Sequence, residues 1–108
     1  MARAVYSTRF ISLVTSSAAS ESYTVPAGYV AVIRDINGVM YPEASTSAYV
    51  EISDTGLFLV YWNAPTDTYG NFRWQGRQVI DSDETISAVS NSPGPVYIAV
   101  SGYLLSAS

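Results

Sequence analysis

Residues 72–86 have the sequence Phe72-Arg73-Trp74-Gln75-Gly76-Arg77-Gln78-Val79-Ile80-Asp81-Ser82-Asp83-Glu84-Thr85-Ile86. This pattern predicts a short strand, a kink at Gly76, a second short strand, and a polar turn that leads into a third strand. The segment holds one of the two tryptophans and two of the five arginines, and its turn is the densest run of charge in the chain. The conformation of residues 72–86 therefore decides how the apolar segments before and after them pack against each other.

Alternation of apolar and polar residues predicts further strands along most of the chain. They cover residues 4–14, 29–36, 48–53, 57–62, 85–90 and 96–105. Residues 29–36 and 57–62 are apolar on both faces, which is typical of strands that are central or covered by a partner. No window of 11 or more residues shows helical periodicity. We expect an all-β fold, a single antiparallel β-sandwich or jelly-roll-like domain of about eight short strands spanning residues 1–108.

Turn signals and small residues separate these strands. Asn37-Gly38 is the strongest hairpin signal in the chain. Residues 15–22 are rich in Ser and Ala, and we expect them to form a connection over the surface. Within the first strand, strict alternation places Phe10 on one face and Ile11 and Leu13 on the other.

The composition is poor in charge and rich in hydroxyl groups. Charged residues make up 13% of the chain, where about 25% is usual. All five cations are arginine, lysine is absent, and there are 16 serines, 8 threonines and 9 tyrosines. Arg and Tyr are favoured at protein interfaces, whereas Lys and Glu are depleted there. The composition favours a component of an assembly, with a Ser/Thr-rich free domain as the alternative.

Catalysis and metal binding have few suitable residues. The chain has no cysteine and no histidine, which excludes disulfides, thiolate sites and the commonest general base. A carboxylate pair such as Asp35 with Glu51 would be needed for glycosidase-type chemistry, but pairing with arginine or turn capping explains these residues more simply. Residues 81–84 could offer oxygen atoms to Ca²⁺, yet they lack the EF-hand spacing and fit a solvated turn better. We expect no enzyme activity, no catalytic residues, no cofactor and no metal.

Two classes of partner are disfavoured. The net charge of −4 and the absence of a basic cluster argue against nucleic acid. No apolar run reaches the roughly 18 residues that span a membrane, and the first residues carry no leader signature.

Aromatic and arginine residues around one expected loop form the best candidate binding site. The candidates are Tyr61, Trp62, Tyr69, Phe72, Arg73, Trp74 and Arg77. Such a set can stack on sugar rings or anchor a protein interface. The alternative is that residues such as Trp62 and Phe72 belong to the core, and the alternation pattern allows both.

Three segments together resemble a known kind of protein. They are Tyr-Thr-Val-Pro-Ala-Gly-Tyr-Val-Ala-Val-Ile-Arg-Asp-Ile at residues 23–36, Phe-Arg-Trp-Gln-Gly-Arg-Gln-Val-Ile at 72–80, and Val-Ser-Gly-Tyr-Leu-Leu at 100–105. This combination resembles small β-rich structural proteins of tailed bacteriophages, found as capsid decoration or minor tail components. The resemblance covers the whole length loosely, and none of the three segments is a catalytic or ligand motif.

The resemblance implies a virion protein, a β-sandwich presented on a capsid or a tail as a symmetric homo-oligomer, and it does not say which of the two. Our first hypothesis is a capsid decoration protein that binds other virion proteins, such as the major capsid protein, and cements the capsid lattice. With no leader signature, we expect the chain to be made in the host cytoplasm. The alternative is a minor tail or adhesion module that binds host-surface carbohydrate.

Overall fold

The computed structural model describes residues 8–15, 19–41, 46–53, 56–64, 70–91 and 95–106. These residues form eight strands: β1 (Thr8–Thr15), β2 (Ala19–Thr24), β3 (Tyr29–Met40), β4 (Thr46–Ile52), β5 (Leu57–Ala64), β6 (Gly70–Ile80), β7 (Thr85–Ser90) and β8 (Val96–Ser106). No helix within these ranges is long and apolar enough to cross a membrane.

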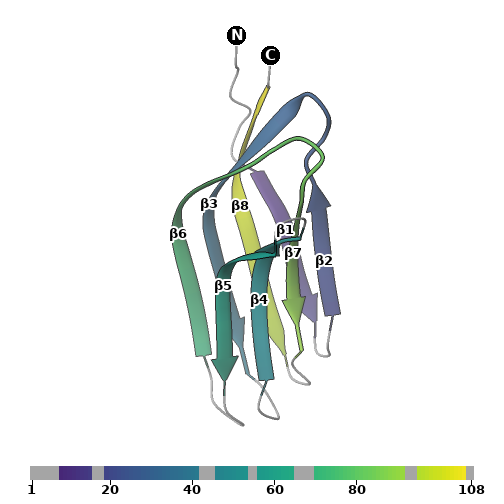
Figure 1. The fold of residues 1–108 in the computed structure, drawn as a ribbon. Helices are drawn as coiled ribbons and strands as arrows, with labels where there is room; N and C mark the ends of the chain where they lie inside the picture. Colours follow the sequence, from purple (N-terminus) through teal and green to yellow (C-terminus); the bar gives the residue numbers. More distant parts are fainter. Residues whose placement is uncertain are drawn as a thin grey trace.

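The strands form two four-stranded antiparallel sheets that pack face to face (Figure 1). The first sheet has the order β1-β8-β3-β6, and the second has the order β2-β7-β4-β5. Strand pairing is nested: β4 pairs with β5, β3 with β6, β2 with β7, and β1 with β8. One long hairpin rolled over on itself in this way is a jelly roll. The prediction of an all-β, jelly-roll-like sandwich is confirmed.

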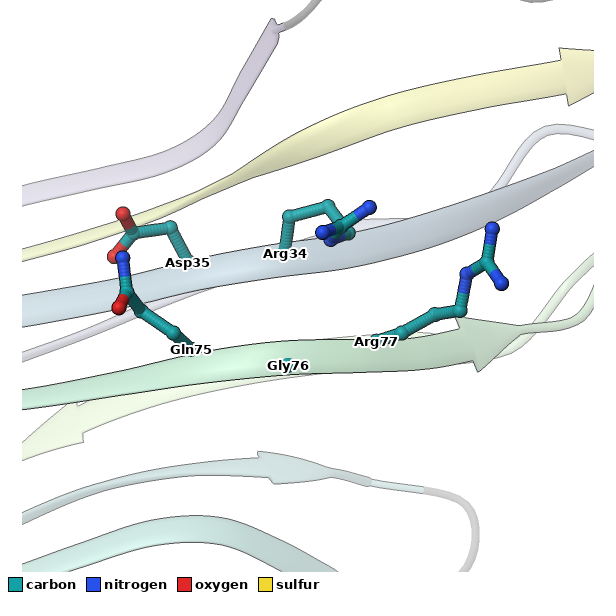
Figure 2. A pocket seen from close by; sticks show the side chains of 5 residues that line it. All are labelled: Arg34, Asp35, Gln75, Gly76 and Arg77. Atoms are coloured by element: carbon teal, nitrogen blue, oxygen red, sulfur yellow. The ribbon is translucent and has the colours of Figure 1, made fainter.

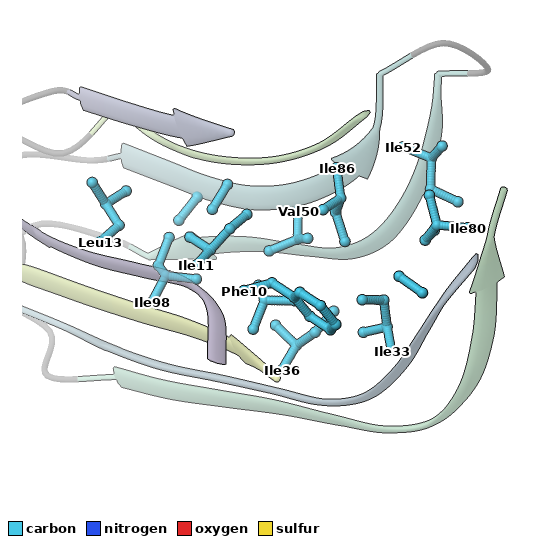
Figure 3. Close-up of a cluster of buried hydrophobic side chains, with 14 of the residues drawn as sticks. Phe10, Ile11, Leu13, Ile33, Ile36, Val50, Ile52, Ile80, Ile86 and Ile98 are labelled. Atoms are coloured by element: carbon cyan, nitrogen blue, oxygen red, sulfur yellow. The ribbon is translucent and has the colours of Figure 1, made fainter. Parts of the chain in front are cut away.

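The core lies between the inner faces of the two sheets (Figure 3). It is dominated by isoleucine and valine, which suit a pleated surface because their branched side chains pack well between neighbouring strands. The alternation of residues 48–53 predicts that Ala48, Val50 and Ile52 face inward, and in β4 the first two are fully buried and Ile52 nearly so. Val32, on the outward face of β3, is also nearly fully buried, with β8 and β6 on either side of its strand.

A row of register shifts crosses the first sheet at one level. In β1, Phe10 is an extra residue between Arg9 and Ile11, whose partners on β8 are adjacent. In β3, a single residue, Arg34, is likewise extra opposite β8. Such bulges bend a strand and re-aim its side chains. The strict alternation expected for the first strand is therefore wrong: Phe10 joins Ile11 and Leu13 in the core.

Residues 19–22, part of the segment expected to be a surface connection, belong to a strand. β2 pairs with β7 along its whole length, and hydroxyl pairs reinforce this pairing. Ser22 Oγ lies 2.9 Å from Ser87 Oγ, and Thr24 Oγ1 lies 2.8 Å from Thr85 Oγ1. Serine and threonine are weak strand signals in a sequence, so this strand depends on its cross-strand partners.

The hairpin predicted at Asn37-Gly38 is also wrong, because both residues lie inside β3. Gly38 is buried and faces Phe72 on β6, its paired neighbour. A Cβ at Gly38 would lie 2.2 Å from Phe72 Cζ, so the ring occupies the space that a side chain would take. Glycine is needed here for close packing and not for a turn.

The expected kink at Gly76 does not interrupt β6, which runs continuously from Gly70 to Ile80. Gly76 instead falls at the register shift between β3 and β6, where β6 has one residue more than β3. The polar turn predicted after this strand is present. It is closed by a 2.8 Å hydrogen bond from the Asp81 backbone N–H to Glu84 Oε1, and Asp83 adopts a φ of 69°.

Candidate binding surfaces

Three of the predicted aromatic residues point into the sandwich. Phe72 is buried, and Trp62 and Trp74 are partly buried against the core. The rings of Trp62 on β5 and Phe72 on β6 stack with centroids 6.4 Å apart, which joins the edge strands of the two sheets. Trp62 Nε1 is buried and has no hydrogen-bond partner among the described residues. These rings close one side of the core and are poorly placed to meet a ligand.

Tyr61 lies on the opposite face of β5 and belongs to an exposed aromatic patch, which we define as Tyr49, Phe58 and Tyr61. The rings of Tyr49 and Tyr61 are stacked 5.7 Å apart, and Phe58 meets both of them edge-on at 5.1 and 5.6 Å. Phe58 is 50% exposed and Tyr61 is 52% exposed. Aromatic rings held in this way on a flat sheet offer a rigid contact surface that loses little entropy on binding.

A bulge in β5 creates the aromatic patch. Glu51 pairs with Phe58 but Val50 pairs with Val60, so Leu59 is an extra residue. Beyond the bulge, Val60 and Trp62 face the core, while Tyr61 faces outward opposite Tyr49. Without this extra residue, the alternation of β5 would place Tyr61 inside and Trp62 outside. The predicted site did not include Tyr49 and Phe58, because their position beside Tyr61 depends on this strand register.

Arg73 and Arg77 lie on the outer face of the first sheet, away from the aromatic patch. The same face carries Arg9 and Arg34, both exposed, so that every arginine in the described residues is on it. Arg73 Nη2 lies 3.6 Å from Asp35 Oδ2, which is the one ion pair among the described residues. We call this surface, defined by Arg9, Arg34, Arg73, Arg77 and Asp35, the arginine face.

A shallow, open hollow in the arginine face is lined by Arg34, Asp35, Gln75, Gly76 and Arg77 (Figure 2). Figure 2 shows Asp35 and Gln75 side by side on neighbouring strands, with Arg34 and Arg77 extending from the other end of the hollow. The bulge in β3 turns two consecutive residues, Arg34 and Asp35, to the same outer face. Asp35 Oδ1 is buried and has no hydrogen-bond partner within the described ranges.

Tyr103 on β8 stands beside this hollow and is held by its two arginines. The pKa of Tyr103 is below the ordinary tyrosine value of 10.0, chiefly because Arg77 donates a hydrogen bond to the phenol oxygen; burial opposes this effect, and Arg34 adds a second hydrogen bond. The phenolate is therefore favoured in the folded state. The ionised Tyr103 stabilises the folded state fully at pH values above the pKa of tyrosine in the unfolded chain. This stabilisation is lost as the pH falls through the lower pKa of Tyr103 in the folded state.

We expect the Arg77→Ala variant to move one tyrosine ionisation to higher pH, because the largest cause of the lowered pKa is removed. The measurement is the phenolate absorbance of the folded protein in an alkaline titration. Arg73→Ala is the matched control, since Arg73 is paired with Asp35. An unchanged titration curve in Arg77→Ala, or an equal change in both variants, would contradict this placement of Tyr103.

A second hollow lies on the same outer face, towards the other end of the first sheet. It is apolar and is lined by Val14, Thr15, Val39, Tyr41, Pro95, Val96 and Tyr97. Val14 is 71% exposed and Tyr41 is 48% exposed. This hollow lies close to Arg73. Asn37 pairs with Arg73, and Val39, which lines the hollow, is the next residue of β3 that faces outward. The first sheet thus presents cations and apolar surface together.

The carboxylates do not form a catalytic pair. Asp35 faces outward from the first sheet and Glu51 faces outward from the second, so the sandwich separates them. Two carboxylates that cleave a glycosidic bond must face each other across one cleft. In the part of the chain that the structure describes, no three acidic side chains gather as metal ligands would. Tyr69, the remaining predicted site residue, lies outside the described residues.

Comparison with known proteins gives a likeness of fold. No family model and no curated protein sequence matches the chain. Among solved structures, the core of Drosophila NLP, whose structure concerns pentamer formation and histone binding, is 15% identical with a TM-score of 0.47 and covers 90% of this chain and 98% of its own. The carbohydrate-binding module CsCBM6-3 of Clostridium stercorarium, solved with cellobiose, is 16% identical with a TM-score of 0.42. The match covers 90% of this chain and 72% of the module.

A virus particle is also among these structures. The virus-like particle of the extra small virus of the prawn Macrobrachium rosenbergii is 12% identical with a TM-score of 0.37 and covers 86% of this chain and 79% of its own. These identities and scores are low. The jelly-roll assignment rests on the strand order of this chain, and the functional argument rests on its surfaces.

Proposed function

We propose that this chain is a non-catalytic structural protein of a tailed-phage virion, which decorates the capsid and cements its lattice. The observation that carries the proposal is the aromatic patch, a rigid apolar surface exposed on a protein with very few charges. Exposed apolar area of this kind marks contact sites when it is rimmed by polar residues. Here the polar rim includes Glu51, on β4, and Ser53, the residue that follows β4. The resemblance of residues 23–36, 72–80 and 100–105 to phage structural proteins supports the same role.

A cementing role requires contact area more than chemistry. A decoration protein stabilises a shell by covering joints between subunits, and aromatic residues contribute most to such contacts. The outward side chains beside β4 include small hydroxyl groups such as Ser53 and Ser87, which hydrogen-bond to each other. Among the described residues, Glu51 is the one charged side chain on this face, so a partner that covers the patch has a single carboxylate to pair.

The test is binding to particles that lack the protein. We expect the Phe58→Ser/Tyr61→Ser double variant to bind to such particles at least about tenfold more weakly than the native chain, because two half-exposed rings of the contact are lost. The measurement is the number of copies per purified particle by mass spectrometry. Tyr29→Ser is the matched control, since Tyr29 is also exposed but lies outside the patch.

Two outcomes would overturn the proposal. Complete absence of the native chain from purified virions would refute a virion role. Undiminished binding of the double variant, with its thermal unfolding unchanged, would show that the aromatic patch is not the docking surface.

The second candidate is a minor tail or adhesion module that binds host-surface carbohydrate. The stacked rings of Tyr49 and Tyr61 favour it, because sugar rings stack on flat aromatic surfaces. The expected observation is binding to a glycan array that Tyr61→Ser abolishes. No binding across a broad panel, together with retention on capsids, would favour the decoration role.

A further inference from the structure

The charge of the molecule is strongly polarised. The arginine face carries four arginines and one aspartate, a formal charge of +3, whereas the whole chain has a formal charge of −4. The remainder of the chain therefore carries −7. A cationic face on an acidic molecule attracts the acidic surfaces of a second copy.

The arginines of this face are incompletely partnered. Of the four, Arg73 alone forms an ion pair with a carboxylate among the described residues. Arg34 and Arg77 lie near the phenol of Tyr103, whose pKa they lower, and both remain exposed. Guanidinium groups stack on aromatic rings as well as pairing with carboxylates, which lysine does less well.

The opposite face of the molecule supplies what these arginines lack. The aromatic patch lies on the outer face of the second sheet, where Glu51 also points outward beside Phe58. Within the described residues, no arginine lies on that face. The two outer faces are thus complementary in charge and in chemistry: cations with apolar surface on one, and aromatic rings with a carboxylate on the other.

We propose that the arginine face of one copy of this chain binds the aromatic patch of a second copy. The proposal rests on the proposed function, since it takes the aromatic patch as an assembly surface. In an open stack of copies the patch of the end copy stays uncovered, and that patch is the one that docks on the capsid. Arg34 and Arg77 stack on the rings of the patch and pair with Glu51.

This contact is head-to-tail. The two faces lie on opposite sides of one sandwich (Figure 1), so each copy uses a different surface for each neighbour. An interface of this type continues past a dimer, and it closes into a ring or extends as a stack according to the angle between the faces. A symmetric two-fold contact would instead use the same face on both copies and stop at two.

The test is sedimentation velocity over a dilution series from about 1 μM to 500 μM, a range that detects weak self-association. We expect the native chain to exceed the mass of a dimer as concentration rises. We expect Arg34→Glu/Arg77→Glu and Phe58→Ser/Tyr61→Ser each to need at least about tenfold higher concentration for the same association. The control variants are Tyr29→Ser and Asp81→Arg, which change an exposed tyrosine and an exposed acid away from both faces.

Mixing the two double variants gives the decisive result. Each retains one intact face. At a concentration where each variant alone is still monomeric, the mixture is therefore expected to form a one-to-one dimer that grows no further. A native chain that remains monomeric throughout, or variants that still associate like the native chain, would overturn the head-to-tail contact. A monomeric native chain that still requires the aromatic patch to bind particles would leave the proposed function standing and make the capsid lattice the partner.

Discussion

Gly102→Ala is expected to lower the free energy of unfolding by about 3–5 kcal/mol, a large part of the total stability of a domain of this size. Gly102 lies in β8 opposite Ile33 of β3, next to the bulge at Arg34. A Cβ at this position would lie 1.9 Å from the carbonyl oxygen of Val32 and 2.9 Å from its carbonyl carbon. Because these are backbone atoms of a central strand, relief requires β3 and β8 to separate.

The measurement is urea unfolding followed by far-ultraviolet circular dichroism, with Gly28→Ala as the control. Gly28 has a φ of 85° but no atom within 4 Å of its Cβ position, so alanine there costs backbone strain of about 1 kcal/mol and no clash. Equal losses in the two variants would refute the claim that close approach of two backbones requires glycine at position 102.

Phe72→Ala is expected to cost about 3–5 kcal/mol, because the ring is buried, stacks on Trp62 and fills the space over Gly38. Gly38→Ala is expected to cost about 1–3 kcal/mol by forcing the ring aside. The double variant is expected to lose at least about 1 kcal/mol less free energy of unfolding than the two single variants together, since the added methyl group then enters the space that the ring has left.

The same unfolding measurement on all four members of this cycle tests the coupling. Phe72→Ala combined with Gly28→Ala is the control, and the effects of these distant sites are expected to add within about 0.5 kcal/mol. Additive effects of Gly38→Ala and Phe72→Ala would mean that the Phe72 ring does not fill the volume that a side chain at position 38 would need.

The fold class was predictable because alternation is a property of each strand alone. Residues 48–53 and 57–62 are strand-like segments separated by a short turn, a pattern that predicts a hairpin, and β4 does pair with β5. β2 was missed because serine, alanine and glutamate give no apolar period. This strand gains its stability from hydroxyl pairs with β7 and from the partly buried Tyr23, which the sequence of residues 19–24 does not reveal.

Local turn signals failed where long-range pairing was stronger. Asn37-Gly38 favours a two-residue hairpin in isolation, but β3 pairs on both sides through this point, with β6 and with β8. Two complete ladders stabilise an extended backbone more than one local turn could, and the Phe72 ring adds packing over the glycine.

The binding surfaces depend on register, which explains why the predicted site was only partly assembled. Counting outward from the turn between β4 and β5 pairs Tyr49 with Val60, whereas the extra residue Leu59 pairs it with Tyr61. A shift of one residue exchanges the two faces of a strand. The arginine face arises in the same way, since the bulge at Arg34 turns it outward together with Asp35. Bulges are properties of strand pairs, and a single sequence does not mark them.

The nested pairing of the jelly roll also constrains how the chain folds. Only β4 and β5 are joined closely enough to pair early, whereas Thr15 of β1 must find Val96 near the end of the chain. A topology dominated by such distant pairs is expected to fold in milliseconds to seconds, with the β4–β5 hairpin as the nucleus. During synthesis, β1 leaves the ribosome long before β8 exists, so the nascent chain carries an unpaired apolar strand until β8 has been made.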